Sequence, residues 1–193
     1  MTALLREYFL SRGEKGDVFV VHRLDRVVGG VTVYAKNART ASELSSSDGF
    51  EKIYLAVVSG ELSEAVGTLE DIIYKDARAR KAYVVSGERQ GAKRASLEYR
   101  VLAVCTVGEK KLSLLRIKLH TGRFHQIRVQ LASRGHPICG DGIYGSREKC
   151  DGISLWAYSL SFSRKGKTLS FSQPPDADSP FWNFFDLNTL LKQ

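Results

Sequence analysis

The 193-residue sequence predicts an α+β domain with a mainly antiparallel, mixed sheet and short flanking helices. Segments that alternate like strands outnumber segments with helical periodicity, and short turns join them without a regular strand–helix alternation. Strands are expected at 17–22, 31–36, 52–59, 96–104, 112–119, 155–162 and 168–171. Helices are expected at 2–12, 38–44 and 124–133. No internal repeat or interdomain linker breaks this pattern, so we expect one domain, residues 1–193, with its own core.

The N-terminal elements follow from apolar spacing and from glycines. The first helix should gather its apolar side chains on one side and stop near Gly13. These side chains are Leu4, Leu5, Tyr8 and Phe9. Residues 23–30 should form a loop between the first two strands, because the paired glycines at its end permit unusual backbone angles. The serine-rich run 45–49 after the second helix is expected to be a turn.

The central and C-terminal elements show clearer periodicity. In segment 52–59 alternate residues should face opposite sides of the sheet. One face would carry Ile53, Leu55 and Val57, and the other Tyr54 and Ala56. A polar turn at 108–111 separates the next two strands. The last helix should end at Gly135, before a glycine-rich connection.

The charge of the chain favours a polyanionic partner. Its formal net charge is +8 and its pI is about 9.5, which alone does not distinguish RNA from DNA or a membrane surface. The positive charge is concentrated in residues 74–94, with aromatic rings between the cations. The residues are Lys75, Arg78, Arg80, Lys81, Arg89, Lys93 and Arg94, with Tyr74 and Tyr83. Phosphate-binding cations beside stacking rings suit nucleic acid, and an ordinary solvated hairpin face fits the same pattern.

Membrane, secreted and metal-dependent classes find no support. No stretch approaches the roughly 20 apolar residues of a membrane helix, and the N-terminus lacks a signal-peptide pattern, so a cytoplasmic protein is expected. Cys105, Cys139 and Cys150 are odd in number and lack a CxxC spacing. His136 lies near Cys139 without a fourth ligand, so neither a disulfide framework nor a metal site is expected.

Arg128 is the first candidate for chemistry. At 100° per residue it falls inside the apolar stripe of the 124–133 helix, where a guanidinium requires a carboxylate or phosphate partner. Asp25 is a plausible partner, because it follows an apolar strand and lies between Arg23 and Arg26, which would keep a nucleophilic carboxylate ionised. A structural ion pair with another acid, or an aspartate that caps a turn, would explain the same residues.

The strand-to-helix turn at 119–128 is the second half of the candidate site. Backbone amides exposed at that helix start, together with Arg123, would suit a phosphate group. The Gly-x-x-x-x-Gly-Lys-Ser/Thr pattern of nucleotide-binding loops is absent.

With these residues in view, the chain resembles the RluA-type pseudouridine synthases. Four blocks carry the resemblance in order between about residues 17 and 172: His22-Arg23-Leu24-Asp25-Arg26, residues 52–60, Thr121-Gly122-Arg123-Phe124-His125-Gln126-Ile127-Arg128-Val129, and residues 135–141 with Tyr144-Gly145. Any one block is weak, and together they are highly specific. The resemblance implies the pseudouridine synthase catalytic fold and an RNA uridine isomerase acting on rRNA or tRNA.

The resemblance also implies residue roles. Asp25 matches the catalytic aspartate, which attacks the target nucleoside so that the uracil can detach, rotate and rejoin through carbon 5. Tyr54 matches the tyrosine that stacks on the base and helps to remove the carbon-5 proton, and Arg128 matches the arginine that pairs with the aspartate. Arg23 matches a residue that enters the RNA stack while the uridine is flipped out. Leu119 and Ile127 would wall the pocket.

The remaining implications concern cofactors and partners. The isomerisation is redox-neutral, so no cofactor and no metal are expected, and the expected partner is RNA, held also by Arg26, Arg78, Arg80, Lys81 and Arg123. We expect no obligate protein partner, a monomer, and no separate RNA-binding module. The family's N-terminal strand and Lys-Pro-x-Gly segment are absent from this chain.

Three substitutions depart from the family pattern. Val28-Gly29-Gly30 replaces Thr-Ser-Gly, Phe124 replaces a small hydroxyl residue, and Trp156 replaces a histidine. The chief alternative to the isomerase is a catalytically silent RNA-binding domain of the same fold. A hydrolase that uses Asp25 with Asp141 is a remoter alternative and is discounted, because Asp141 lies in a glycine-rich connection without a recognisable acid–base partner.

Overall fold

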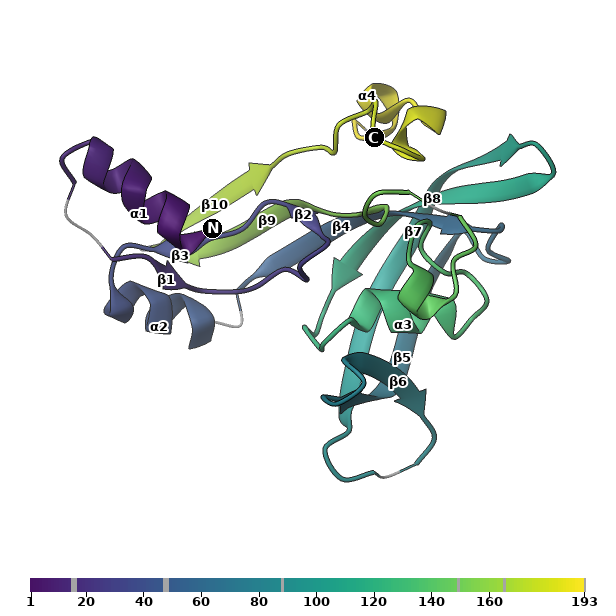
Figure 1. Cartoon of the computed structure of the whole chain (residues 1–193), viewed down its shortest axis with the longest axis horizontal. Coiled ribbons are helices and arrows are strands. Elements are labelled where there is room, and N and C mark those ends of the chain that lie inside the picture. Colours follow the sequence, from purple (N-terminus) through teal and green to yellow (C-terminus); the bar gives the residue numbers. More distant parts are fainter. Residues whose placement is uncertain (15–16, 47–48, 88, 149, 165, 193) are drawn as a thin grey trace.

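The structure, a computed structural model, describes residues 1–14, 17–46, 49–87, 89–148, 150–164 and 166–192 (Figure 1). Its strands are β1 (Phe19–Val20), β2 (Gly29–Gly30), β3 (Tyr34–Ala35), β4 (Glu51–Ser59), β5 (Val66–Asp76), β6 (Lys81–Val85), β7 (Lys93–Val107), β8 (Lys110–Leu119), β9 (Leu155–Arg164) and β10 (Lys167–Ser172). Its helices are α1 (Thr2–Ser11), α2 (Ala38–Ser46), α3 (Gln126–Ala132) and α4 (Leu187–Leu190), with short 3₁₀ helices at Gly142–Tyr144 and Trp182–Phe184.

An eight-stranded sheet forms the body of the protein. Its strands follow the order β10–β9–β4–β8–β7–β5–β6, and β2 pairs with β9. The β2–β9 pairing is parallel and the other pairings along this order are antiparallel. β1 and β3 form a separate two-stranded sheet. The predicted α+β class, with a mainly antiparallel mixed sheet and short helices, is confirmed.

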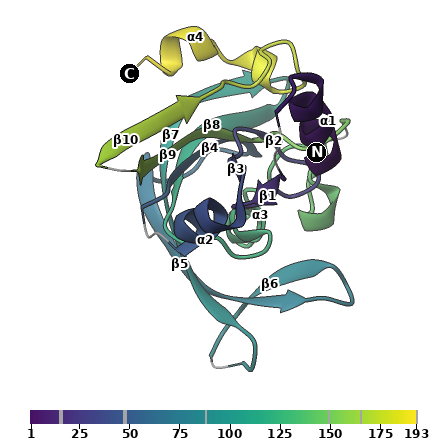
Figure 2. The same cartoon turned by 90° about the vertical axis from the view of Figure 1, so that its left-hand side faces the viewer.

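The core lies on both faces of the central strand β4. Leu55, Ala56, Val57 and Val58 are all 0% exposed, because α3 covers one face of the sheet and the C-terminal segment covers the other (Figure 2). Ala56 and Val58 pack with Ile127 and Leu131 of α3 on the first face. Leu55 and Val57 pack with Trp182, Phe185 and Leu187 on the second. The predicted two-sided alternation of this strand is therefore confirmed, with Tyr54 on the α3 side.

Several element predictions were incomplete. The hairpin of β5 and β6, which extends away from the body in Figure 1, was not predicted as strands, because the apolar residues of β5 (Val66, Leu69, Ile72 and Ile73) do not follow the alternation of a strand. The strands expected at 17–22 and 31–36 shorten to the two-residue β1 and β3. The turn expected at 45–49 begins as the last residues of α2, and residues 47–48 lie outside the described part.

The helices also differ in detail. α1 has its predicted position, but none of its residues is buried, so its apolar side does not join the core. Among the described residues no helix is both long enough and apolar enough to cross a membrane.

Candidate active site

Asp25 lies in a loop that is anchored to the main sheet at its C-terminal end. Within the loop the Val28 N–H donates to the Asp25 carbonyl over 3.0 Å. Gly29 and Gly30, predicted as part of a loop, instead form β2 and pair in parallel with Trp156 and Ala157 of β9. The catalytic-loop candidate is thus tied to the sheet four residues after Asp25.

The pairing of β2 with β9 requires glycine at both positions. A Cβ at Gly29 would lie 2.2 Å from the Trp156 ring, and a Cβ at Gly30 would lie 2.2 Å from the Ala157 carbonyl oxygen. Gly30 also has a φ of +119°, which L side chains rarely adopt. Gly29 and Trp156 are two of the three departures from the family pattern, and they contact each other. The missing side chain at 29 makes room for the larger ring at 156.

Arg128 is buried, as its helical position predicted, and it has two acidic partners. The Asp141 carboxylate accepts from Arg128 Nε over 2.6 Å and from Nη2 over 2.8 Å, which is a bidentate pair. Asp25 Oδ2 accepts from Nη1 over 3.3 Å. Burial opposes the charge of Arg128, but the bonds and charge of Asp141, followed by those of Asp25, more than offset it, so the pKa of Arg128 is raised.

The expected contact of Arg128 with Asp25 is therefore present, and a closer partner was missed. From sequence Asp141 enters only as a remote hydrolase acid without a recognisable partner, and the structure provides that partner in Arg128. Asp141 is 1% exposed, and its two oxygens are engaged by Arg128. A buried carboxylate with both oxygens bonded to a guanidinium is a structural ion-pair partner, which removes the support for a hydrolase that uses Asp25 with Asp141.

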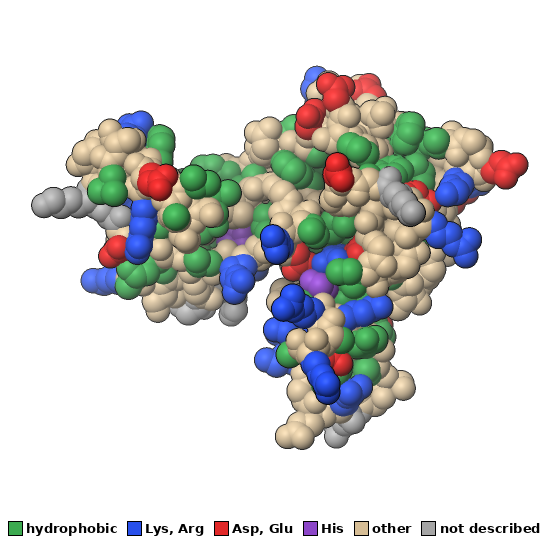
Figure 3. Space-filling model, in the orientation of Figure 1, with side chains coloured by type: hydrophobic (Ala, Val, Ile, Leu, Met, Phe, Trp, Pro, Cys, Tyr) green, Lys and Arg blue, Asp and Glu red, His purple; other side chains and the backbone are tan. Residues whose placement is uncertain are grey.

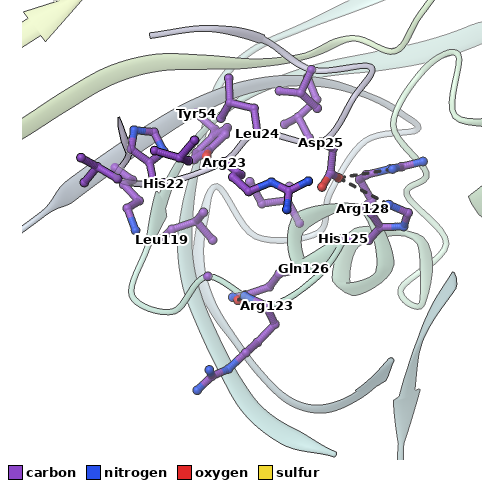
Figure 4. A pocket seen from close by; sticks show the side chains of 17 residues that line it. His22, Arg23, Leu24, Asp25, Tyr54, Leu119, Arg123, His125, Gln126 and Arg128 are labelled. Carbon is purple, nitrogen blue, oxygen red and sulfur yellow. Dashed lines mark hydrogen bonds and ion pairs between the residues drawn. The ribbon is translucent and has the colours of Figure 1, made fainter. Parts of the chain in front are cut away.

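The helix that carries Arg128 starts later than predicted, at Gln126, because His125 has a left-handed backbone with φ 53°. The buried Gln126 side chain holds this turn: its Oε1 accepts from the Arg123 N–H over 3.0 Å, and its Nε2 donates to the Ser96 carbonyl over 3.1 Å. The ring of this left-handed residue faces the loop that carries Asp25. His125 Nε2 lies 3.7 Å from Asp25 Oδ2, and Figure 4 marks this contact with a dashed line.

A cavity of about 520 Å³ opens beside Asp25. Tyr54 from β4 lines it, with Leu119 and Ile127 as apolar wall, Arg128, and the Arg23 side chain that projects among them in Figure 4. Burial, together with the negative charge of Asp25, raises the pKa of Tyr54 to about 12. The phenol therefore keeps its proton at neutral pH in the free protein.

His22 also lines this cavity. Its Nε2 accepts the Val33 N–H over 3.2 Å, which requires an unprotonated nitrogen. Burial, assisted by the nearby charge of Lys52, lowers the pKa of His22 to about 4. This histidine is thus a neutral structural acceptor between the two short strands β1 and β3.

A second cavity of about 920 Å³ lies on the other side of Asp25 and reaches the β5–β6 hairpin. Among the described residues, six cations line it: Arg23, Arg26, Lys75, Arg80, Arg123 and Arg128. Its two acids are Asp25 and Asp141, both of which contact Arg128. Figure 3 shows Lys and Arg side chains on the protruding hairpin lobe and around the notch above it.

The other predicted RNA-binding residues lie outside this lining. Arg78 is exposed in the turn of the hairpin. Lys81 is half-buried, with its Nζ 5.3 Å from the centre of the Tyr144 ring and 5.7 Å from that of Tyr83. The structure thus gathers Arg23, Arg26, Arg80 and Arg123 around the site, and places Arg78 and Lys81 at its margin.

Three residues of the site were missed by sequence reasoning: Asp141, His125 and Tyr144. Each lies in a block quoted for the resemblance, but none had a role there. The signal that could have found Asp141 is the Arg128 position itself, since a fully buried guanidinium has five donors and one carboxylate engages only two of them. Among the described residues, no three His, Cys, Asp or Glu side chains gather so that they could hold a metal ion.

Known proteins with similar sequences identify the class to which this fold and this acid–arginine site belong. A sequence model described as RNA pseudouridylate synthase matches residues 3–133. Ribosomal large subunit pseudouridine synthase D of Borreliella burgdorferi is 40% identical over 129 residues, covering 65% of this chain and 38% of that protein. An uncharacterized RNA pseudouridine synthase of Haemophilus influenzae is 34% identical over 170 residues, covering 86% of this chain and 71% of that protein. The chain belongs to the RNA pseudouridylate synthase family.

A solved structure agrees at the level of the fold. Human RNA Pseudouridylate Synthase Domain Containing 1 has a TM-score of 0.77 and 23% sequence identity, with 97% of this chain and 82% of that chain covered. The family match includes Asp25, Tyr54 and Arg128, whereas Asp141 and Tyr144 lie beyond it. The chain spans 38% and 48% of the lengths of the first two curated relatives.

Proposed function

We propose that the protein is an RNA pseudouridine synthase that converts uridines of structured RNA, rRNA or tRNA, to pseudouridine. The observation that carries the proposal is the Asp25 carboxylate, held by Arg128 in the wall of a cavity that it shares with Tyr54. Membership of the family supports the reaction class.

Asp25 is the proposed nucleophile. Its Oδ2 faces Arg128 and His125, and within the described part of the chain its Oδ1 has no hydrogen bond or ion pair. The carboxylate is partly exposed, at 25%, so its free oxygen is open to the sugar of a bound nucleotide. Arg128 makes only one, longer hydrogen bond to Asp25, because its bidentate ion pair is with Asp141.

Tyr54 is proposed to stack on the flipped base in the smaller cavity, with Leu119 and Ile127 beside it. A phenol with a pKa of about 12 is a poor proton acceptor in the free protein. Part of that raised pKa comes from the charge of Asp25, which disappears once the carboxylate forms a bond to the sugar. Loss of that charge would lower the pKa of Tyr54, so the phenol could pass its own proton to water more readily, and the phenolate that remains could accept the carbon-5 proton.

The larger cavity is proposed to hold the RNA next to the target. Its lining cations suit phosphates, and its contact with the hairpin continues the positive surface outward. Arg23 lines both cavities, the position expected of a side chain that replaces the flipped base in the stack.

The proposal predicts product without added factors. Purified protein, given cellular rRNA and tRNA transcripts in EDTA, should form pseudouridine, detected by mass spectrometry of the digested RNA. Asp25→Asn should form none, because a neutral amide is no nucleophile, and it should bind the same RNA with near-normal affinity. If the wild-type protein bound RNA but produced no pseudouridine in any transcript, the silent RNA-binding domain would be the better assignment. A requirement for a metal or nucleotide would contradict the mechanism.

A further inference from the structure

A line of polar atoms joins the basic hairpin to Asp25. The backbone N–H of Ala82 in β6 donates to Tyr144 Oη over 2.8 Å. The same oxygen lies 2.9 Å from His125 Nδ1, and His125 Nε2 lies 3.7 Å from Asp25 Oδ2. Each of these groups comes from a different segment of the chain, so the line connects four parts of the fold.

One placement of the protons gives every N–H and O–H donor in this line an acceptor. Because the Tyr144 oxygen accepts the Ala82 N–H, its own O–H is left to donate, and His125 Nδ1 is the acceptor within reach. A neutral imidazole that accepts at Nδ1 carries its proton on Nε2, the nitrogen that faces Asp25. Rotating the ring by half a turn would set carbon atoms against both the hydroxyl and the carboxylate.

The surroundings favour the same protonation states. Burial raises the pKa of Tyr144 to about 12, although the Ala82 N–H and Arg128 oppose the rise, so the hydroxyl keeps its proton. Burial also lowers the pKa of His125. The charges of Arg128 and Lys75 add to that lowering, while Asp25 and Asp141 oppose it. The Phe124 ring stacks on the imidazole at 3.8 Å and shields one of its faces from water.

We infer that His125 is a positioning residue for the proposed reaction, held as its Nε2–H tautomer by Tyr144 and aimed as a donor at the Asp25 carboxylate. The inference rests on the proposed function. At 3.7 Å the last contact is longer than a hydrogen bond, and catalytic contacts of this kind commonly close only when substrate binds. Two donors on Oδ2, from Arg128 and His125, would direct the free Oδ1 toward the sugar.

Nitrogen-15 NMR of the histidine side chains tests the tautomer without RNA. The chain has four histidines, and His125→Asn identifies the His125 signals. At pH 7 the wild-type protein should carry the His125 proton on Nε2 alone. Tyr144→Phe should move part of the population to Nδ1, because the donor that fixes the tautomer is gone. A wild-type His125 protonated on Nδ1 alone, or on both nitrogens, would overturn the inference whether or not the protein is active.

A matched pair of substitutions tests the positioning. The amide nitrogen of Gln can occupy the place of Nε2, whereas that of Asn corresponds to Nδ1, so only His125→Gln keeps a donor toward Asp25. Asn tolerates the left-handed backbone at 125 well, so strain does not account for a defect in His125→Asn. We expect kcat to fall on the order of 100-fold in His125→Asn and less than about 10-fold in His125→Gln, with similar KM for RNA.

The outcomes of this test are separable. Equal losses of kcat in the two variants, or a change confined to KM, would contradict the positioning role. Absence of pseudouridine formation by the wild-type protein would instead contradict the proposed function, and the NMR result would then decide the inference on His125.

Discussion

The acid–arginine centre and the basic hairpin both carry dense charge, but they hold it in opposite ways. At the centre Arg128 is 3% exposed and Asp141 1%, and each charge has a defined partner. On the hairpin Arg78 and Arg80 are exposed, and several cations lie over aromatic rings rather than beside acids. Desolvated charges depend on geometry, whereas exposed charges act through their number and sign. Single substitutions should therefore have large, specific effects at the centre and small, cumulative ones on the hairpin.

The largest effect is expected at Asp141. Asp141→Asn removes the charge that balances a buried guanidinium, which should lower the free energy of unfolding by about 3–5 kcal/mol. Asp25→Asn is the matched control: Arg128 keeps its bidentate partner and the lost contact is longer and partly exposed, so the loss should stay below about 1 kcal/mol. Urea unfolding of both variants measures the difference. Equal losses of unfolding free energy would mean that Asp25 and Asp141 contribute equally to the ion pair with Arg128, which would contradict the shorter, bidentate contact of Asp141.

An intermediate effect is expected on the hairpin. Replacing Arg78 by Ala and Arg80 by Asn, which suits the left-handed backbone at 80, should weaken RNA binding to all sequences alike. The salt dependence of log K should flatten by up to about 0.9 per lost phosphate contact. Lys167→Gln is the control, because β10 and β6 are the opposite ends of the sheet order. Filter binding at several salt concentrations provides the slopes, and an unchanged slope in the double variant would assign the hairpin to an ordinary solvated face.

The smallest effect concerns His22, which is half-buried and forms no ion pair within the described part of the chain. Its folded-state pKa of about 4 lies below the ordinary value, so the unfolded chain takes up the proton first as the pH falls. Stability should therefore decrease between about pH 6.5 and pH 4, by roughly 1 kcal/mol from pH 7 to pH 5.5. His125 contributes in the same direction.

The matching variant isolates the contribution of His22. In His22→Gln the amide oxygen can still accept the Val33 N–H but does not titrate, so the pH dependence should flatten without disappearing. Denaturant titrations at the two pH values measure it, and the same slope as wild type would show that His22 is not the group responsible.

The parts predictable from sequence are those in which a short-range pattern determines the structure. The alternation in β4 gave the correct faces because both are buried, and the helical phase of Arg128 gave its burial. The pattern could not show that Asp141 reaches Arg128, since the residues between them turn through glycines with no periodicity. It also could not show β2, because the two glycines pair with Trp156 and Ala157 of β9, which lie far along the chain. Long-range packing without repetition leaves no local signal.

The glycine pair has a consequence for reading mutational data. Any side chain at 29 or 30 must displace either the Trp156 ring, which is fixed through its Nε1 bond to the Gln173 carbonyl, or the backbone of Ala157. A saturation screen scored by activity would therefore return glycine alone at both positions, as strictly as aspartate at 25. The intolerant positions 25, 29 and 30 would lie close together in the sequence and could all be mistaken for catalytic residues. Recovery of Gly29→Ser by a smaller residue at 156 would distinguish a spatial constraint from a chemical one.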